Sequence, residues 1–119
     1  MPLEDEHAMP ANFAKISVQS LFELHQNQAT LQVIDVRETQ EYQEVRAHIG
    51  SNIPLSLLHQ GLGKEQLPPS LDLPVYIICR SGMRSLAACE ILQQLGYKNL
   101  VNVTGGMLAW QAEALPLGK

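Results

Sequence analysis

A strand, a tight turn and a helix follow one another directly in the second half of the chain, and this succession limits the possible folds. Residues 75–79 read Val-Tyr-Ile-Ile-Cys, a continuous apolar run typical of a strand that is buried on both faces. The polar residues 80–82 end this run. From Ser85 onward, apolar residues recur at helical spacing up to Gly96, a residue typical of the position just after a helix. A strand followed by a helix is the repeating unit of parallel α/β sheets.

The same alternation extends over most of the chain. Apolar runs at 31–36 and 100–103 predict two further buried strands, and 49–55 predicts a short strand before an irregular connection. The predicted helices run from the N-cap residue Ser17 to about Gln28, from 39 to 45 and from 107 to 114. Strands that alternate with helices form a parallel sheet with helices on both faces, so the predicted fold class is α/β.

Length and charge indicate the class of protein. A chain of 119 residues, 45% of them hydrophobic, suits one packed domain, which we place at 14–119 after a flexible acidic tail at 1–13. The net charge of -4 argues against nucleic acid as a partner, because phosphate binding needs a basic face. No apolar run approaches the roughly 20 residues that cross a bilayer, so no membrane partner is expected. The acidic N-terminus lacks the features of a secretory signal, which favours a cytoplasmic location.

Cys79 follows the central predicted strand, at the edge where open α/β sheets bind ligands. Residues 79–84 can curl so that successive backbone N–H groups point inward, and Gly82 permits a left-handed or closely approaching backbone. Such a ring stabilises an anion, and the guanidinium groups of two arginines favour the Cys79 thiolate in the same way. Cys79 is therefore the candidate nucleophile, and the candidate anion-binding residues are Arg80, Ser81, Gly82, Met83, Arg84 and Ser85.

The segment Cys-Arg-Ser-Gly-Met-Arg-Ser at 79–85 resembles the active-site loop of rhodanese domains. Three other stretches resemble the same family in the same order: Val33–Arg37 with Glu41 and Tyr42, His48 and Ile49 leading to Asn52–Pro54, and Gly105 and Gly106 with Trp110. The resemblance implies a five-stranded parallel sheet with flanking helices. Between Ile49 and Asn52 the family usually carries more residues than the two found here.

The resemblance also implies a sulfurtransferase that needs no cofactor. In the implied cycle, Cys79 takes a sulfane sulfur from thiosulfate or a persulfide and then gives it to cyanide or a thiol. A protein thiol such as that of thioredoxin is a further acceptor. The residues agree with this cycle, because a covalent intermediate needs a good nucleophile and a site that holds an anionic persulfide.

Several other polar or reactive residues have a simpler structural interpretation. Asp35 and Arg37 lie at the end of a predicted strand beside the loop. Arg37 can pair with Glu41, and Asp35 can accept hydrogen bonds from backbone N–H groups or from an arginine. Both residues are therefore expected to fix the neighbouring loops. Cys89 lies on an apolar helix face and is expected to pack as a free thiol. His48 is expected to be structural, and the four histidines show no zinc-site spacing, so no metal is expected.

Two other functions compete with sulfur transfer. Phosphatases and arsenate reductases of related fold also use a cysteine in an anion-binding loop, but they place the arginine one residue farther on. The shorter loop that Arg84 closes here fits one outer sulfur atom better than several oxygens. The second alternative is a persulfide carrier or a sulfur-delivery and interaction module, which would use the same residues without turnover.

Overall fold

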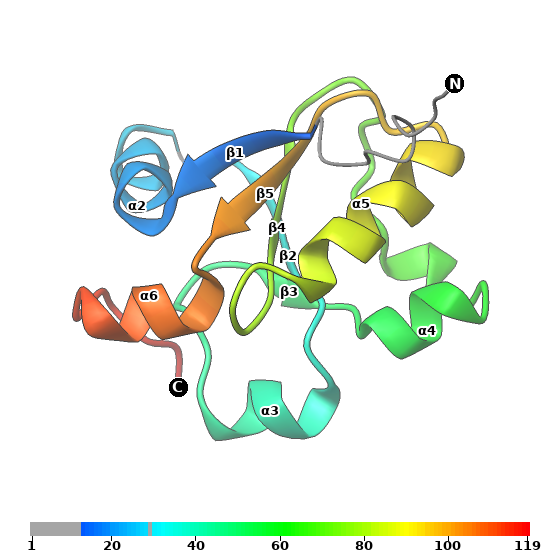
Figure 1. The fold of residues 1–119 in the computed structure, drawn as a ribbon. Coiled ribbons are helices and arrows are strands. Elements are labelled where there is room, and N and C mark those ends of the chain that lie inside the picture. The colour runs from blue at the N-terminus through cyan, green and yellow to red at the C-terminus, as the bar shows by residue number, and fades with distance from the viewer. Residues whose placement is uncertain (1–12, 29) are drawn as a thin grey trace, which may run out of the picture.

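A parallel five-stranded sheet forms the centre of the computed structural model, which describes residues 13–28 and 30–119 (Figure 1). Its strands are β1 (Ala14–Ser17), β2 (Gln32–Asp35), β3 (Ser51–Asn52), β4 (Val75–Ile78) and β5 (Leu100–Thr104). They lie in the order β1-β5-β4-β2-β3, and every neighbouring pair is parallel. The predicted α/β class and the five-stranded parallel sheet are confirmed.

Helices cover the two faces of the sheet (Figure 1). The helices are α2 (Val18–Asn27), α3 (Thr39–Glu44), α4 (Leu55–His59), α5 (Arg84–Gln94) and α6 (Gly106–Ala112), with a 3-10 turn, η2, at Lys64–Gln66. On one face α4 and α5 pack over strand residues that include Ile34 and Ile77. On the other face α2 and α6 pack over strand residues that include Val33 and Ile78. Neighbouring strand residues thus belong to opposite cores, as the period of two in a strand requires.

The register of the sheet brings three loops to one edge. Asp35 at the end of β2 pairs in register with Ile78 at the end of β4, and Ile77 pairs with Asn102 near the end of β5. Because parallel strands all end at the same edge, the segments that follow β2, β4 and β5 meet there. The short helix α3 lies beyond this edge (Figure 1).

Some local features differ from the prediction. The edge strand β1 is not predicted from its residues, because three of its four side chains are exposed and show no apolar alternation. The helix α4 replaces part of the expected irregular connection and begins directly after Pro54. The predicted tail at 1–13 lies outside the described residues except for Phe13, which packs against the core beneath α5. No helix in the described part of the chain has the length and apolar character needed to span a membrane.

Candidate active site

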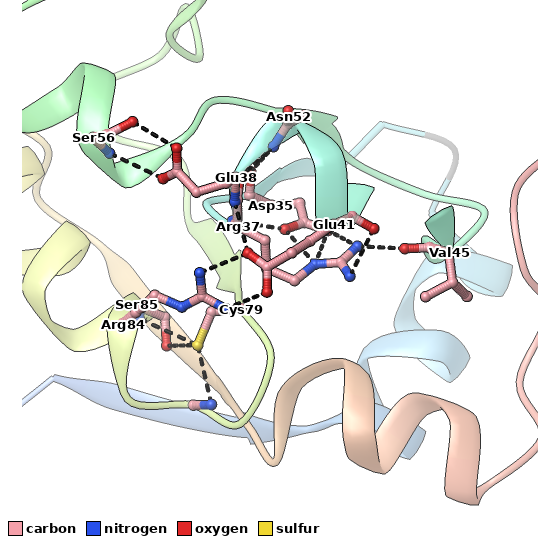
Figure 2. A network of polar contacts seen from close by, with 11 residues as sticks. Asp35, Arg37, Glu38, Glu41, Val45, Asn52, Ser56, Cys79, Arg84 and Ser85 are labelled. Atoms are coloured by element: carbon pink, nitrogen blue, oxygen red, sulfur yellow. Dashed lines mark hydrogen bonds and ion pairs between the residues drawn. The ribbon is translucent and has the colours of Figure 1, made fainter. Parts of the chain in front are cut away.

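The sulfur of Cys79 lies at the end of β4, the middle strand of the sheet, and is enclosed by the loop that follows. The Cys79 side chain is fully buried. The backbone N–H of Gly82 donates a hydrogen bond to Sγ at 3.0 Å, and the backbone N–H of Ser85 donates another at 3.3 Å (Figure 2). Ser85 lies in the first turn of α5, where N–H groups have no partner within the helix. The loop and the start of α5 therefore direct two N–H dipoles at one sulfur atom, which favours negative charge there.

Asn102 of β5 ties this loop together from behind. The asparagine is buried; its Nδ2 donates to the carbonyl oxygen of Gly82 at 3.2 Å, and its Oδ1 accepts a hydrogen bond from the Ser85 hydroxyl. These are the two residues whose N–H groups contact the sulfur. Sequence reasoning missed Asn102; the available signal was a single polar residue inside an apolar strand.

The N-terminus of α6 forms a second wall of the site. The N–H of Met107 donates to the carbonyl oxygen of Cys79 at 2.8 Å, and that of Leu108 donates to the carbonyl oxygen of Arg80 at 3.0 Å. This approach requires glycine at position 106, because a Cβ there would lie 2.3 Å from the Cys79 carbonyl oxygen. The Gly105-Gly106 pair thus permits α6 to hold the backbone of the cysteine loop.

Asp35 and Arg37 form a buried ion pair beneath α3. Nη2 of Arg37 lies 2.8 Å from Oδ2 of Asp35 and also donates to the carbonyl oxygen of Val45 at 2.7 Å. The expected pairing of Arg37 with the Glu41 carboxylate is not found, because Arg37 reaches only the backbone carbonyl of Glu41, at 3.4 Å. The Arg37 guanidinium is instead paired with the buried carboxylate of Asp35, and from there it binds carbonyl oxygens in α3 and at its C-terminal end.

The Glu41 carboxylate pairs with Arg84 instead (Figure 2). Nη1 and Nη2 of Arg84 donate to Oε1 and Oε2 of Glu41 at 2.7 and 2.8 Å, a two-bond pairing that links the cysteine loop to α3. The hydrogen bonds from Arg84 lower the pKa of Glu41 to about 2, and the same pairing raises the pKa of Arg84. Both side chains are about one-third exposed, at 33% and 34%, so the pair lies at the border of the site.

Comparison with known proteins places this architecture in a family. Residues 18–113 match the model of the rhodanese-like domain. The chain belongs to the rhodanese-like family. YtwF of Bacillus subtilis is 37% identical over 107 residues, which cover 86% of this chain and 94% of YtwF. A sulfurtransferase of Allochromatium vinosum is 32% identical over 85 residues, covering 71% of this chain and 76% of that protein.

Solved structures show the same fold. The crystal structure of a rhodanese-related protein from Thermoplasma volcanium superposes with a TM-score of 0.72 at 34% identity, covering 88% of this chain and 97% of the other. A rhodanese-like domain protein from Staphylococcus aureus gives a TM-score of 0.70 at 28% identity, covering 82% of this chain and 91% of the other. The rhodanese-like fold inferred from the sequence is therefore confirmed.

The candidate residues of this rhodanese-like domain fall into two groups. Cys79, Gly82 and Ser85 converge on the sulfur, whereas the side chains of Arg80, Ser81 and Met83 form the exposed rim of the loop, with Met83 72% exposed. Arg84 lies between the groups through its pairing with Glu41. The loop thus directs the N–H groups of Gly82 and Ser85 at the sulfur and the side chains of Arg80, Ser81 and Met83 at its surface.

Two residues set aside as structural lie where packing explains them. Cys89 of α5 is a buried free thiol, and burial raises its pKa to about 12, which keeps it protonated at neutral pH. The His48 ring contacts those of Phe22, His25 and Trp110 on the side of the sheet covered by α2 and α6. The His48 side chain is exposed at its outer side; partial desolvation by these rings, followed by the charge of His25, lowers the pKa of His48.

Proposed function

We propose that this rhodanese-like protein is a sulfurtransferase that carries a sulfane sulfur as a persulfide on Cys79. The observation that supports this proposal best is the pair of N–H groups of Gly82 and Ser85 at 3.0 and 3.3 Å from Sγ. Negative charge on sulfur is needed both for attack on a donor and for storage of a persulfide anion. The sulfurtransferase from Allochromatium vinosum among the relatives supports the same reaction class.

The proposed cycle has two displacement steps and needs no external oxidant. In the first step, the Cys79 thiolate attacks the outer sulfur of thiosulfate or of a persulfide. A new S–S bond forms, the S–S bond of the donor breaks, and sulfite or a thiolate leaves with the electron pair. In the second step, cyanide or a thiolate attacks the terminal sulfur of the Cys79 persulfide. The products are thiocyanate or a new persulfide, and the Cys79 thiolate is regenerated.

Burial of the sulfur has a consequence for access. Cys79 has no exposed surface, whereas Ser81 and Met83 of the same loop are exposed. Entry of a donor therefore requires an outward displacement of this rim, while the Asn102 contacts hold the part of the loop that carries the N–H donors. Once formed, a persulfide in the closed loop is shielded from water and from adventitious thiols.

The same geometry weighs against phosphatase or arsenate reductase activity. A bound tetrahedral oxyanion would need the loop arginine as a partner for its oxygens, but both terminal nitrogens of Arg84 are engaged by Glu41. The N–H groups of Gly82 and Ser85 already converge on Cys79 Sγ, and a ring this tight suits one added sulfur atom better than several oxygens. A persulfide carrier that works without turnover would use the same residues, and it differs only in the rate of the second step.

Parallel assays of sulfur transfer and phosphate hydrolysis test this proposal. We expect the native protein to form thiocyanate from cyanide and a sulfane donor, and we expect no hydrolysis of an aryl phosphate. The Cys79→Ser variant should lose thiocyanate formation and keep its far-UV circular dichroism, because the exchange leaves the packing nearly unchanged. Aryl phosphate hydrolysis by a native protein that forms no thiocyanate with any donor would overturn the proposal.

A further inference from the structure

The pairing of Arg84 with Glu41 determines which positive charge is left for a sulfur donor. Both terminal nitrogens of Arg84 lie within 2.8 Å of a Glu41 carboxylate oxygen. A dianionic donor such as thiosulfate would gain from a free guanidinium beside the loop. Here the guanidinium is already neutralised, so a dianion has to compete with Glu41 for it.

Glu41 is fixed in this position by its own helix. The backbone N–H of Glu38 donates to Oε1 of Glu41 at 3.0 Å, one half of a capping box at the start of α3. Arg37 holds the other end of α3 through the carbonyl oxygen of Val45 at 2.7 Å. If the Glu41 carboxylate leaves Arg84, it therefore also gives up the hydrogen bond from the Glu38 N–H, and this favours the paired position.

Two further arginines, Arg37 and Arg80, lie near the site. The charge of Arg37 is balanced by Asp35. A cavity of about 120 Å³ between α3 and α6 is lined by Glu41 and Glu44 and also by Arg37 and exposed Arg80. A dianion beside Arg80 therefore meets both positive and negative side chains in this cavity, and the pairing of Arg84 is the difference that Glu41 makes.

We propose that Glu41 is a specificity-determining residue, which by holding Arg84 selects sulfane donors with one negative charge, such as persulfides and thiosulfonates, over the dianion thiosulfate. This inference rests on the proposed sulfur transfer through Cys79. Glu41 acts through Arg84 and does not itself touch the transferred sulfur.

Two donors of similar shape and different charge isolate this effect. Methanethiosulfonate carries one negative charge and thiosulfate carries two, and each places its outer sulfur on a sulfonyl sulfur. Attack by the Cys79 thiolate breaks the S–S bond in both cases, releasing methanesulfinate from one and sulfite from the other. The ratio of kcat/KM for thiosulfate to kcat/KM for methanethiosulfonate, with cyanide as acceptor, is the quantity to measure. A variant that merely disturbs the loop changes both values and leaves their ratio unchanged.

The variants Glu41→Gln and Glu44→Gln form a matched pair, since both remove one negative charge from α3 and the same cavity. We expect Glu41→Gln to raise the thiosulfate to methanethiosulfonate ratio by about tenfold, a change of about 1.4 kcal/mol in relative barrier height. Glu44→Gln should change the ratio by less than about twofold, because it leaves Arg84 paired. Added salt should lower the thiosulfate rate more steeply in Glu41→Gln than in the native protein, because only the variant has a free Arg84 to attract a dianion.

The outcomes separate this inference from the proposed function. An unchanged ratio in Glu41→Gln, or equal changes in both variants, overturns the role of Glu41 while sulfur transfer by Cys79 stands. Absence of transfer from both donors in the native protein overturns the proposed function itself. If Glu41→Gln fails to fold, the native salt dependence decides: a steep fall of the thiosulfate rate with salt shows that the site already attracts dianions and contradicts the inference.

Discussion

The sulfur of Cys79 accepts hydrogen bonds from two backbone N–H groups, those of Gly82 and Ser85. The hydrogen bonds from Gly82 and Ser85 are short because the loop backbone is held in place, and Asn102 is the side chain that holds it. Asn102 contacts both residues that donate to the sulfur and does not contact the sulfur itself. It is therefore a positioning residue, and its effect should be the same for every donor.

Replacement of this asparagine gives the first prediction. Asn102→Ala removes both hydrogen bonds and leaves the Gly82 carbonyl unpaired, so the free energy of unfolding should fall by about 1–3 kcal/mol. Sulfur transfer should fall about tenfold or more, by the same factor for thiosulfate and methanethiosulfonate. Urea denaturation and steady-state kinetics provide the two measurements.

Asn99→Ala, at an exposed asparagine just before β5, is the matched control. An Asn102→Ala variant of full activity would show that the loop holds its shape without this contact.

At the scale of single residues, sequence reasoning located the loop better than its partners. Cys79, Gly82 and Ser85 are close in sequence, and the arrangement of N–H groups follows from local turn geometry. The partner of Arg84 lies 43 positions away, at Glu41, and only the tertiary fold brings the two together. The roles assigned to all these residues in sulfur transfer remain predictions.

At the scale of the elements, strands and helices with strong patterns were predicted to within a few residues. β4 and α5 follow from a buried apolar run and a helical period, and α2 begins directly after Ser17, whose side chain accepts from the N–H of Ser20 at 3.1 Å. β1 was missed because an exposed edge strand has little apolar signal. It is recognisable only from its pairing with β5, which is a long-range contact.

The contact between α6 and the cysteine loop gives a prediction at this scale. Gly106 has a φ of 53°, and an added Cβ would lie 2.3 Å from the Cys79 carbonyl oxygen and 2.7 Å from the Arg80 carbonyl oxygen. Backbone atoms cannot rotate away, so Gly106→Ala should displace α6, lower the free energy of unfolding by about 3 kcal/mol or more and reduce sulfur transfer.

Gly61→Ala is the matched control for this change. Gly61 has a φ of 74°, but an added Cβ would meet no atom within 4 Å. The substitution should therefore cost only the backbone strain, about 1–2 kcal/mol, and leave transfer intact. Urea denaturation measures the loss of stability in both variants. Equal losses would mean that Gly106→Ala costs only backbone strain, and that the close contact between α6 and the cysteine loop contributes nothing further.

At the scale of the whole molecule, the parallel sheet gathers the site at one edge. The ends of β2, β4 and β5 supply the Asp35–Arg37 pair, Cys79 and the Gly105-Gly106 pair at the start of α6, while α3 brings Glu41 to the cysteine loop. Family resemblance indicated this overall arrangement, because the motifs occur along the chain in the order found in the family. The ion pairs between loops depend on side-chain packing, and motif order gives no information on them.

Storage of one sulfur atom on Cys79 is the central claim of this account, and mass spectrometry of the sulfur-loaded protein tests it most directly. The native protein is treated with methanethiosulfonate or thiosulfate, freed of excess donor and analysed intact and after digestion, beside Cys79→Ser and Cys89→Ala. We expect the added mass of one sulfur atom in the native protein and in Cys89→Ala, located on the Cys79 peptide, and we expect no added mass in Cys79→Ser. Cys89 should carry none, because its pKa of about 12 keeps that thiol protonated. Sulfur located on Cys89, or no retained sulfur with either donor, would contradict the account.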